Sequence, residues 1–194
     1  MKSSLFLLGT SLADNVLLCY FDNQAQLRPT VAKFYPEDID ATLCTHVVFN
    51  SARLRLGMNG EYGLGPLMWN DLDEEWMTGM YTRLNALKQD NPHLKTILSV
   101  RNSDQWTKMV TSGTSIRGFI KNAIQYVRNN GFDGIELDWR YPARCNEVQC
   151  SPEVLSKTLT ICINHIFLRR TSMPFKVCTR TFAIRSHSLI RHFF

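Results

Sequence analysis

The feature that most constrains the fold is an alternation of short apolar runs with longer amphipathic ones. Four apolar runs predict buried strands, at residues 16–21, 45–49, 95–100 and 134–139. Residues 74–89 and 115–129, which lie between them, carry apolar side chains at helical spacing. Apolar strands joined by helices pair in parallel and are covered on both faces. The sequence therefore predicts an α/β protein.

Later elements extend this alternation. Ser151-Pro152-Glu153 resembles a helix start, with serine at the N-cap and proline in the first turn. Residues 175–179 predict a fifth strand. Residues 53–73 contain four glycines and predict a turn-rich excursion before the first long helix. A chain of 194 residues is long enough for one domain with a substantial core.

The basic charge of the chain is concentrated in its last part. From Val154 onward there are seven basic residues and no acidic one, which leaves 15 basic and 17 acidic residues before it. No nucleic-acid-binding module accompanies the basic residues, so nucleic acid is not an expected partner. No segment is long and apolar enough to predict a membrane span.

The cysteines and the N-terminus suggest an oxidising compartment. Six cysteines are compatible with two or three disulfides in a secreted domain. Residues 1–13 resemble a short signal peptide, with Lys2 before an apolar stretch and Ala13 among small residues. An ordinary frayed N-terminus is the alternative. We therefore expect a secreted, extracellular protein.

Residues 132–142, Phe-Asp-Gly-Ile-Glu-Leu-Asp-Trp-Arg-Tyr-Pro, resemble the signature of the glycoside hydrolase family 18 chitinases and chitinase-like lectins. That signature is Asp-Gly-x-Asp-x-Asp-x-Glu followed by Tyr-Pro. Residues 18–21, 43–46 and 94–99 resemble the family's first three strands, in the same order. The resemblance covers roughly residues 16–170 and implies a (β/α)8 TIM barrel.

The resemblance implies only part of such a barrel, because a complete one takes about 250 residues. Residues 14–178 would form the first four to five strand–helix units, and residues 179–194 form a divergent tail. An incomplete barrel exposes strand edges, so we expect the chain to be poorly stable as an isolated monomer.

Alternation along the fourth strand places the charged residues of the signature on one face. Glu136, Asp138 and Arg140 share this face, and apolar residues occupy the other. In a barrel the charged face would line the interior near the carboxyl ends of the strands, where the active sites of such barrels lie.

The resemblance also implies a chemistry, and the sequence departs from it. In the family, the last glutamate of the signature protonates the leaving oxygen, and the aspartate before it orients the substrate's N-acetyl group, which is the nucleophile. Asp138 matches the orienting aspartate, Asp133 and Glu136 match the earlier acidic positions, and Arg140 stands at the acid position. A guanidinium stays protonated and cannot act as the acid. We expect an inactive homologue, with no intact catalytic set.

An active hydrolase that uses Glu136 or Asp138 instead is an alternative. It needs a carboxylic acid that stays protonated near neutral pH, which the neighbouring Arg140 opposes. A second alternative is a lectin-like protein that binds chitin or N-acetylglucosamine oligomers. A third is a fragment of a chitinase that hydrolyses β-1,4-N-acetylglucosamine linkages.

The sugar-binding positions that the resemblance implies are only partly kept. Tyr20 and Tyr141 match family aromatics near the sugar. Three aromatic positions of the family have changed: Gln24 and Ser103 replace tryptophans, and Ser51 replaces an aromatic residue. Trp106 follows three residues after Ser103 and is not expected to substitute for the missing tryptophan. Arg101-Asn102 replaces a glycine pair. Sugars bind by stacking on aromatic rings, so we expect weak binding of chitin oligomers at most.

The resemblance further implies a disulfide between Cys19 and Cys44, which flank the family's first two strands. No cofactor is expected. Cys145, Cys150, Cys162 and His165 could in principle bind a metal, but this pattern matches no standard zinc spacing, so no metal is expected either.

Overall fold

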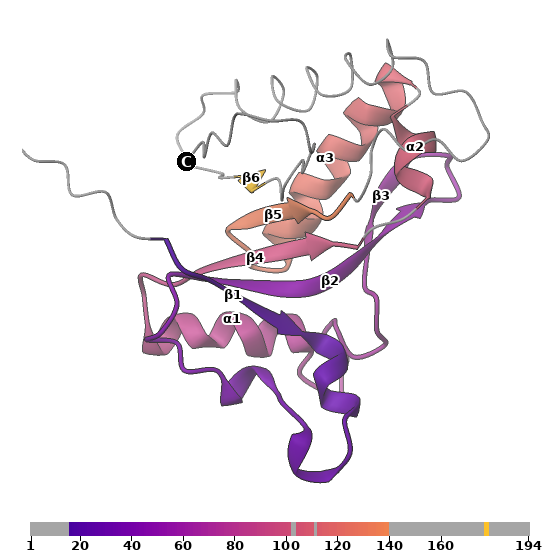
Figure 1. Ribbon diagram of the computed structural model, residues 1–194. Helices are drawn as coiled ribbons and strands as arrows, with labels where there is room; N and C mark the ends of the chain where they lie inside the picture. Colours follow the sequence, from indigo (N-terminus) through magenta and orange to yellow (C-terminus); the bar gives the residue numbers. More distant parts are fainter. Residues whose placement is uncertain (1–15, 102–103, 111, 140–176, 179–194) are drawn as a thin grey trace, which may run out of the picture.

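The sheet is parallel and open across the part of the protein that the computed structural model describes, residues 16–101, 104–110, 112–139 and 177–178 (Figure 1). Its strands follow the order β1-β2-β4-β5-β6. They are β1 (Leu18–Asp22), β2 (His46–Leu56), β4 (Lys95–Val100), β5 (Gly134–Leu137) and β6 (Val177–Cys178), with β3 (Tyr62–Gly65) antiparallel to β2. The α/β class and the partial, unclosed barrel are therefore confirmed.

The helices of the described residues are α1 (Met80–Asp90), α2 (Gln105–Met109) and α3 (Gly113–Asn129), with short 3-10 helices η1 (Asn23–Leu27), η2 (Thr30–Ala32) and η3 (Pro36–Asp38). The main core lies where α1 and α3 cover one face of the sheet. Phe49 of β2 is fully buried there and packs against the rings of Phe21, Tyr81 and Phe132. The opposite face carries both apolar residues, such as Val48 and Ile97, and the polar residues of the candidate site.

Helix α3 shows how local sequence sets an element. The Ser112 hydroxyl accepts hydrogen bonds from the amides of Thr114 and Ser115, which satisfies two free donors of the first turn. Apolar residues at helical spacing are buried along the helix, and Gly131 ends it with a φ of 74°. The helix predicted over residues 115–129 is confirmed.

Helix α1 and the strand β2 differ from the prediction. α1 begins at Met80 and not at residue 74, and Trp76, which the helical pattern had included, lies before the helix and is exposed. β2 continues to Leu56 and forms a hairpin with β3, so the predicted excursion over residues 53–73 contains two regular strand segments. Leu54 and Tyr62 are buried in the hairpin, which explains why this glycine-rich stretch becomes sheet.

Two further elements differ in extent. β5 ends at Leu137, two residues before the predicted end. Of the predicted fifth strand, residues 175–179, only Val177–Cys178 lie among the described residues, and they form β6. The short helix α2 was not predicted, because five residues give too short a window for periodicity. The helix expected after Ser151 lies outside the described residues.

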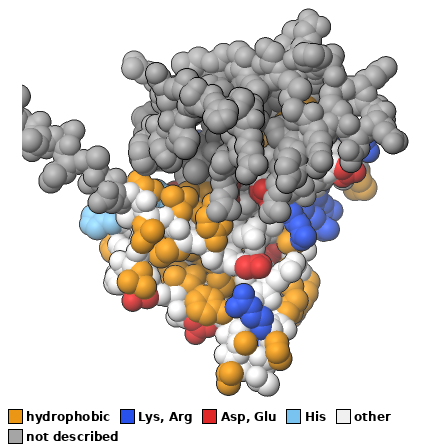
Figure 2. Space-filling model, viewed as in Figure 1, with side chains coloured by type: hydrophobic (Ala, Val, Ile, Leu, Met, Phe, Trp, Pro, Cys, Tyr) orange, Lys and Arg blue, Asp and Glu red, His pale blue; other side chains and the backbone are white. Residues whose placement is uncertain are grey.

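A disulfide joins Cys19 of β1 to Cys44, just before β2, with 6.0 Å between their Cα atoms. This separation is usual for a disulfide, and the predicted pairing is confirmed. Among the described residues, no helix combines the length and apolarity needed to cross a membrane. Figure 2 shows hydrophobic side chains interspersed with acidic and basic ones on the visible described surface.

Candidate functional site

The register of the parallel strands places one row of polar residues across the sheet near its carboxyl edge. Asp22 pairs with Asn50, Asn50 with Ser99, and Ser99 with Glu136. Residues in one row share a face, and their neighbours Phe21, Phe49 and Leu98 pack against the helices on the other face. The row therefore lies on the face that would line a barrel interior.

Glu136 is the most deeply buried acid of this row, with 2% of its surface exposed. The Tyr20 hydroxyl donates a hydrogen bond of 2.8 Å to Glu136 Oε1, although the two residues lie on strands separated by β2 and β4. A hydrogen bond to a carboxylate is stronger than one between neutral groups, and it offsets part of the cost of burial. The structure thus brings together two residues that the sequence singled out separately.

Ser99, which the sequence analysis did not single out, is buried beside Glu136 in the register. Its position in an apolar strand, Lys-Thr-Ile-Leu-Ser-Val, offered a signal, because a serine within such a run needs a polar neighbour.

Asp138 comes directly after β5. Its backbone N–H donates to the carbonyl of Val100 at 3.0 Å, which continues the pairing with β4, and its side chain is half-buried. Arg140 and Tyr141 lie outside the described residues, so their roles stay predictions.

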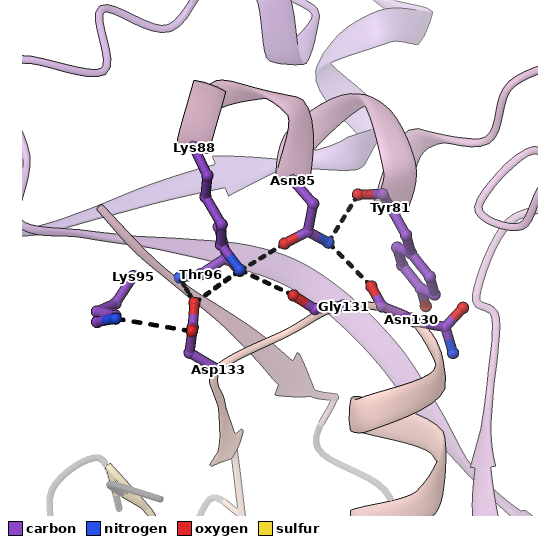
Figure 3. A network of polar contacts seen from close by, with 8 residues as sticks. All are labelled: Tyr81, Asn85, Lys88, Lys95, Thr96, Asn130, Gly131 and Asp133. Atoms are coloured by element: carbon purple, nitrogen blue, oxygen red, sulfur yellow. Dashed lines mark hydrogen bonds and ion pairs between the residues drawn. The ribbon is translucent and has the colours of Figure 1, made fainter. Parts of the chain in front are cut away.

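Asp133 lies at the opposite, amino end of β5 and does not join the site (Figure 3). Its carboxylate accepts hydrogen bonds from the Thr96 amide at 2.8 Å and pairs with Lys88 at 2.7 Å, and Lys95 approaches to 3.9 Å. Burial alone would raise the pKa of Asp133, but the hydrogen bonds from Lys88 and Thr96 and the two positive charges outweigh it and hold the pKa below its ordinary value. This part of the signature therefore ties α1, β4 and β5 together.

Of the three positions where the family has an aromatic residue and this chain does not, Gln24 and Ser51 lie among the described residues. Gln24 is exposed in η1, and Ser51 is buried. Trp106 is 1% exposed, stacks on Trp139 and packs edge-on against Phe119. It belongs to the core and cannot offer a face to a sugar.

An exposed tryptophan pair lies at the same edge of the sheet and was missed by the sequence analysis. Trp69 and Trp76 stack with ring centroids 6.0 Å apart and an interplanar angle of 18°, yet they are 68% and 73% exposed. Asp71, two residues after Trp69, accepts a hydrogen bond from Asn23, the residue that follows β1. Two tryptophans within acidic, polar sequence were the available signal.

No group of three or more His, Cys, Asp or Glu side chains in the described residues is placed to hold a metal ion. Cys145, Cys150, Cys162 and His165 lie outside the described residues, so the expectation about them stays a prediction.

Several known proteins are similar to this chain in sequence and in fold. An endochitinase of Brugia malayi is 40% identical over 129 residues, which cover 64% of this chain and 25% of that protein. The crystal structure of a group IV chitinase of Ostrinia furnacalis matches with a TM-score of 0.65 and 29% identity, over 79% of this chain and 41% of that one. Human YKL-39, described as a pseudo-chitinase with retained chitooligosaccharide binding, matches with a TM-score of 0.61 and 28% identity, over 84% and 43%.

The chain thus spans about a quarter of the length of the curated relatives it matches. The family profile named "Glycosyl hydrolases family 18" matches residues 16–165, which is most of the chain. With the parallel sheet, the Tyr20–Glu136 contact and the signature on β5, this match establishes that the chain belongs to glycosyl hydrolase family 18.

Proposed function

We propose that this chain is a catalytically inactive member of its family. The observation that carries the proposal is Arg140, which occupies the acid position of the signature, two residues after Asp138. A positioned general acid contributes about 10²–10⁴-fold to a rate, and a guanidinium cannot supply the proton. Glu136 does not replace the acid in this proposal, because it is buried and accepts the hydrogen bond from Tyr20.

The test is turnover of a soluble N-acetylglucosamine hexamer, with products separated by chromatography. We expect no product above a blank without protein, and none from Arg140→Glu, since Arg101-Asn102 also replaces the family's glycine pair. Asp138→Asn is the matched control, because it removes the residue that would orient the N-acetyl group. Turnover by the native chain that disappears in Asp138→Asn would refute inactivity, whereas turnover that persists in it comes from a contaminating hydrolase.

A second candidate function is binding of N-acetylglucosamine oligomers without cleavage. The exposed Trp69–Trp76 pair favours it, because tryptophan faces stack on the apolar faces of sugar rings. YKL-39 is described as combining loss of chitinase activity with retained oligomer binding, which supports the same combination here.

Binding can be tested by titrating the chain with the same hexamer and following tryptophan fluorescence. We expect Trp69→Ala and Trp76→Ala each to weaken binding by about tenfold or more, about 1.4 kcal/mol. Ile124→Ala is the control, because Ile124 is an exposed apolar residue on α3. Equal affinities for all four proteins would exclude the tryptophan pair as the binding surface.

We also propose that the chain is secreted. The Cys19–Cys44 disulfide supports this, because such bonds persist in oxidising compartments. Expression with its own residues 1–13, followed by assay of the medium and mass analysis of the N-terminus, tests this proposal.

A further inference from the structure

The Trp69–Trp76 pair needs a rigid support, because two exposed indoles that stay parallel lose side-chain freedom without the compensation of burial. The two tryptophans lie in the loop between β3 and α1, on either side of Asp71. Asp71 is completely buried although its neighbour Trp69 is mostly exposed. The support for the pair must therefore come from residues beneath the surface, and Asp71 is central among them.

The carboxylate of Asp71 holds the backbone just before Trp69. Its Oδ2 accepts hydrogen bonds from the amides of Leu67 at 2.7 Å and Met68 at 2.8 Å. Its Oδ1 accepts from the side-chain amide of Asn23. One carboxylate therefore fixes two successive peptide groups of the loop against the end of β1.

The main chain at Asp71 holds the segment that follows Trp76. The Asp71 carbonyl accepts from the amide of Tyr81 at 3.0 Å, and the Asn70 carbonyl accepts from the amide of Met80 at 2.9 Å. These are free donors of the first turn of α1, so residues 70 and 71 act as its cap. A Cβ at Gly79 would clash with the backbone of Leu72, which shows how closely the two segments pack.

A second set of hydrogen bonds joins this loop to η1. The side chains of Asn70 and Gln26 are joined by a 2.7 Å hydrogen bond, and Gln26 Nε2 donates to Asn23 Oδ1 at 2.7 Å. Asn23, Gln26, Asn70 and Asp71 are all buried, so this group forms a polar cluster under the tryptophan loop.

The burial of Asp71 disfavours the ionised form of its carboxyl group. Burial raises the pKa of Asp71 to about 6, in spite of the amides of Met68 and Leu67 and the positive charge of Arg53, which oppose the rise. The other titratable groups that face it, the hydroxyls of Tyr81 and Tyr126, bring no positive charge. Keeping this carboxylate ionised therefore costs free energy, and what it supplies in return is a fixed loop geometry.

We propose that Asp71 is the positioning residue of an oligomer-binding surface formed by Trp69 and Trp76, a role that rests on the binding function proposed above. Asp71 touches no sugar in this arrangement. It sets the direction of Trp69 through the amides of Leu67 and Met68, and it sets the place of Trp76 through the first turn of α1.

The decisive variant is Asp71→Asn in the full chain. A carboxamide keeps the shape, but its NH2 group cannot accept a hydrogen bond, so either Asn23 or the amides of Leu67 and Met68 lose their acceptor. Stacked indoles give an exciton couplet in far-ultraviolet circular dichroism, which reports their geometry without any ligand. Both Trp69–Trp76 and Trp106–Trp139 are stacked, so the contribution of the exposed pair is the part of the couplet that Trp69→Ala removes. We expect Asp71→Asn to lose most of this part of the couplet and to bind the N-acetylglucosamine hexamer about tenfold or more weakly.

Asp133→Asn is the matched control, because it removes a hydrogen-bonded carboxylate at the other end of the sheet. It should lower stability but leave the couplet and the affinity unchanged. Trp69→Ala and Trp76→Ala identify the signal, since each should remove the contribution of the exposed pair and leave that of the Trp106–Trp139 pair.

The outcomes separate the two proposals. A folded Asp71→Asn protein that keeps the native couplet overturns the positioning role, and so does an equal loss in Asp133→Asn. Loss of the couplet only in Asp71→Asn supports the positioning role, even if the native chain binds no hexamer, in which case the binding function alone fails.

Discussion

Replacement of Asp71 by asparagine should change how the stability of the protein depends on pH. Asp71 has a folded-state pKa of about 6, raised by burial, against 3.8 for the ordinary carboxyl. Between these two values the folded state binds a proton that the unfolded state has released. The free energy of unfolding therefore falls as the pH rises from about 4 to about 6, and it stays lowered above that.

The size of the effect follows from the distance between the two pKa values. At about 1.4 kcal/mol for each pH unit, the ionised carboxylate costs about 3 kcal/mol of stability at pH 7 and above, relative to pH 4. Asparagine has no proton to exchange in this range. The native protein should therefore lose about 2–3 kcal/mol more than Asp71→Asn when the pH is raised from 4 to 8.

Urea unfolding of both proteins at several pH values, followed by circular dichroism, measures this difference. The comparison isolates Asp71, because the other carboxylates titrate equally in both proteins. The absolute stability of Asp71→Asn is not the readout, since the variant gains by losing a buried charge and loses hydrogen bonds at the same time. Parallel pH profiles for the two proteins would show that this carboxylate is not destabilised by burial, and the reasoning above would fail.

Three further perturbations test the fold. Replacing Cys19 and Cys44 by serine should lower the free energy of urea unfolding by about 3.5 kcal/mol, because the unfolded chain is no longer closed into a loop spanning 25 residues. Reduced native protein is the control and should show the same loss, whereas an unchanged free energy of unfolding would contradict the prediction. Phe49→Ala should cost about 3–5 kcal/mol, because Phe49 is fully buried among three aromatic rings, whereas exposed Val31→Ala should cost little. Lys88→Met should raise the lowered pKa of Asp133. The Asp133 carboxylate stabilises the fold above pH 3.8 and loses this contribution as the pH falls through its lowered pKa, so the variant should unfold at a higher pH than the native protein. An unchanged midpoint of acid unfolding would argue against the ion pair.

The parts of the fold that sequence predicted well are those where periodicity and local signals agree. Helix α3 has an amphipathic pattern, a serine cap and a terminating glycine, and its bounds differ from the prediction by two residues. The predicted start of helix α1 was wrong. Trp76 fits the helical spacing, but Asn70, Asp71 and Asp73 accept hydrogen bonds from the amides at the start of α1 and keep the segment before Met80 out of the helix. Such tertiary hydrogen bonds leave no periodic trace in the sequence.

The residues of the candidate site also differ in how well the sequence predicted their positions. Alternation along β5 correctly separated Glu136 from the apolar residues that face the helices, because successive side chains of any extended strand point to opposite faces. Sequence did not separate Asp133 from Glu136, although Asp133 lies at the amino end of the strand in the network of Figure 3. The tryptophan pair was missed because Trp69 and Trp76 lie at separate positions of one irregular loop and meet only in three dimensions.

The contacts near the carboxyl edge explain how binding and hydrolysis could separate in this chain. In the inactive protein proposed above, a single position of the signature, the one that Arg140 occupies, accounts for the loss of proton donation. The surface around Trp69, by contrast, depends on hydrogen bonds to Asn23, Leu67 and Met68, none of which involves the signature on β5. A change at the acid position therefore leaves the support of the tryptophan pair intact. This independence is what the hexamer titrations test, because Arg140→Glu should leave the affinity of the Trp69–Trp76 surface unaltered while Asp71→Asn should reduce it.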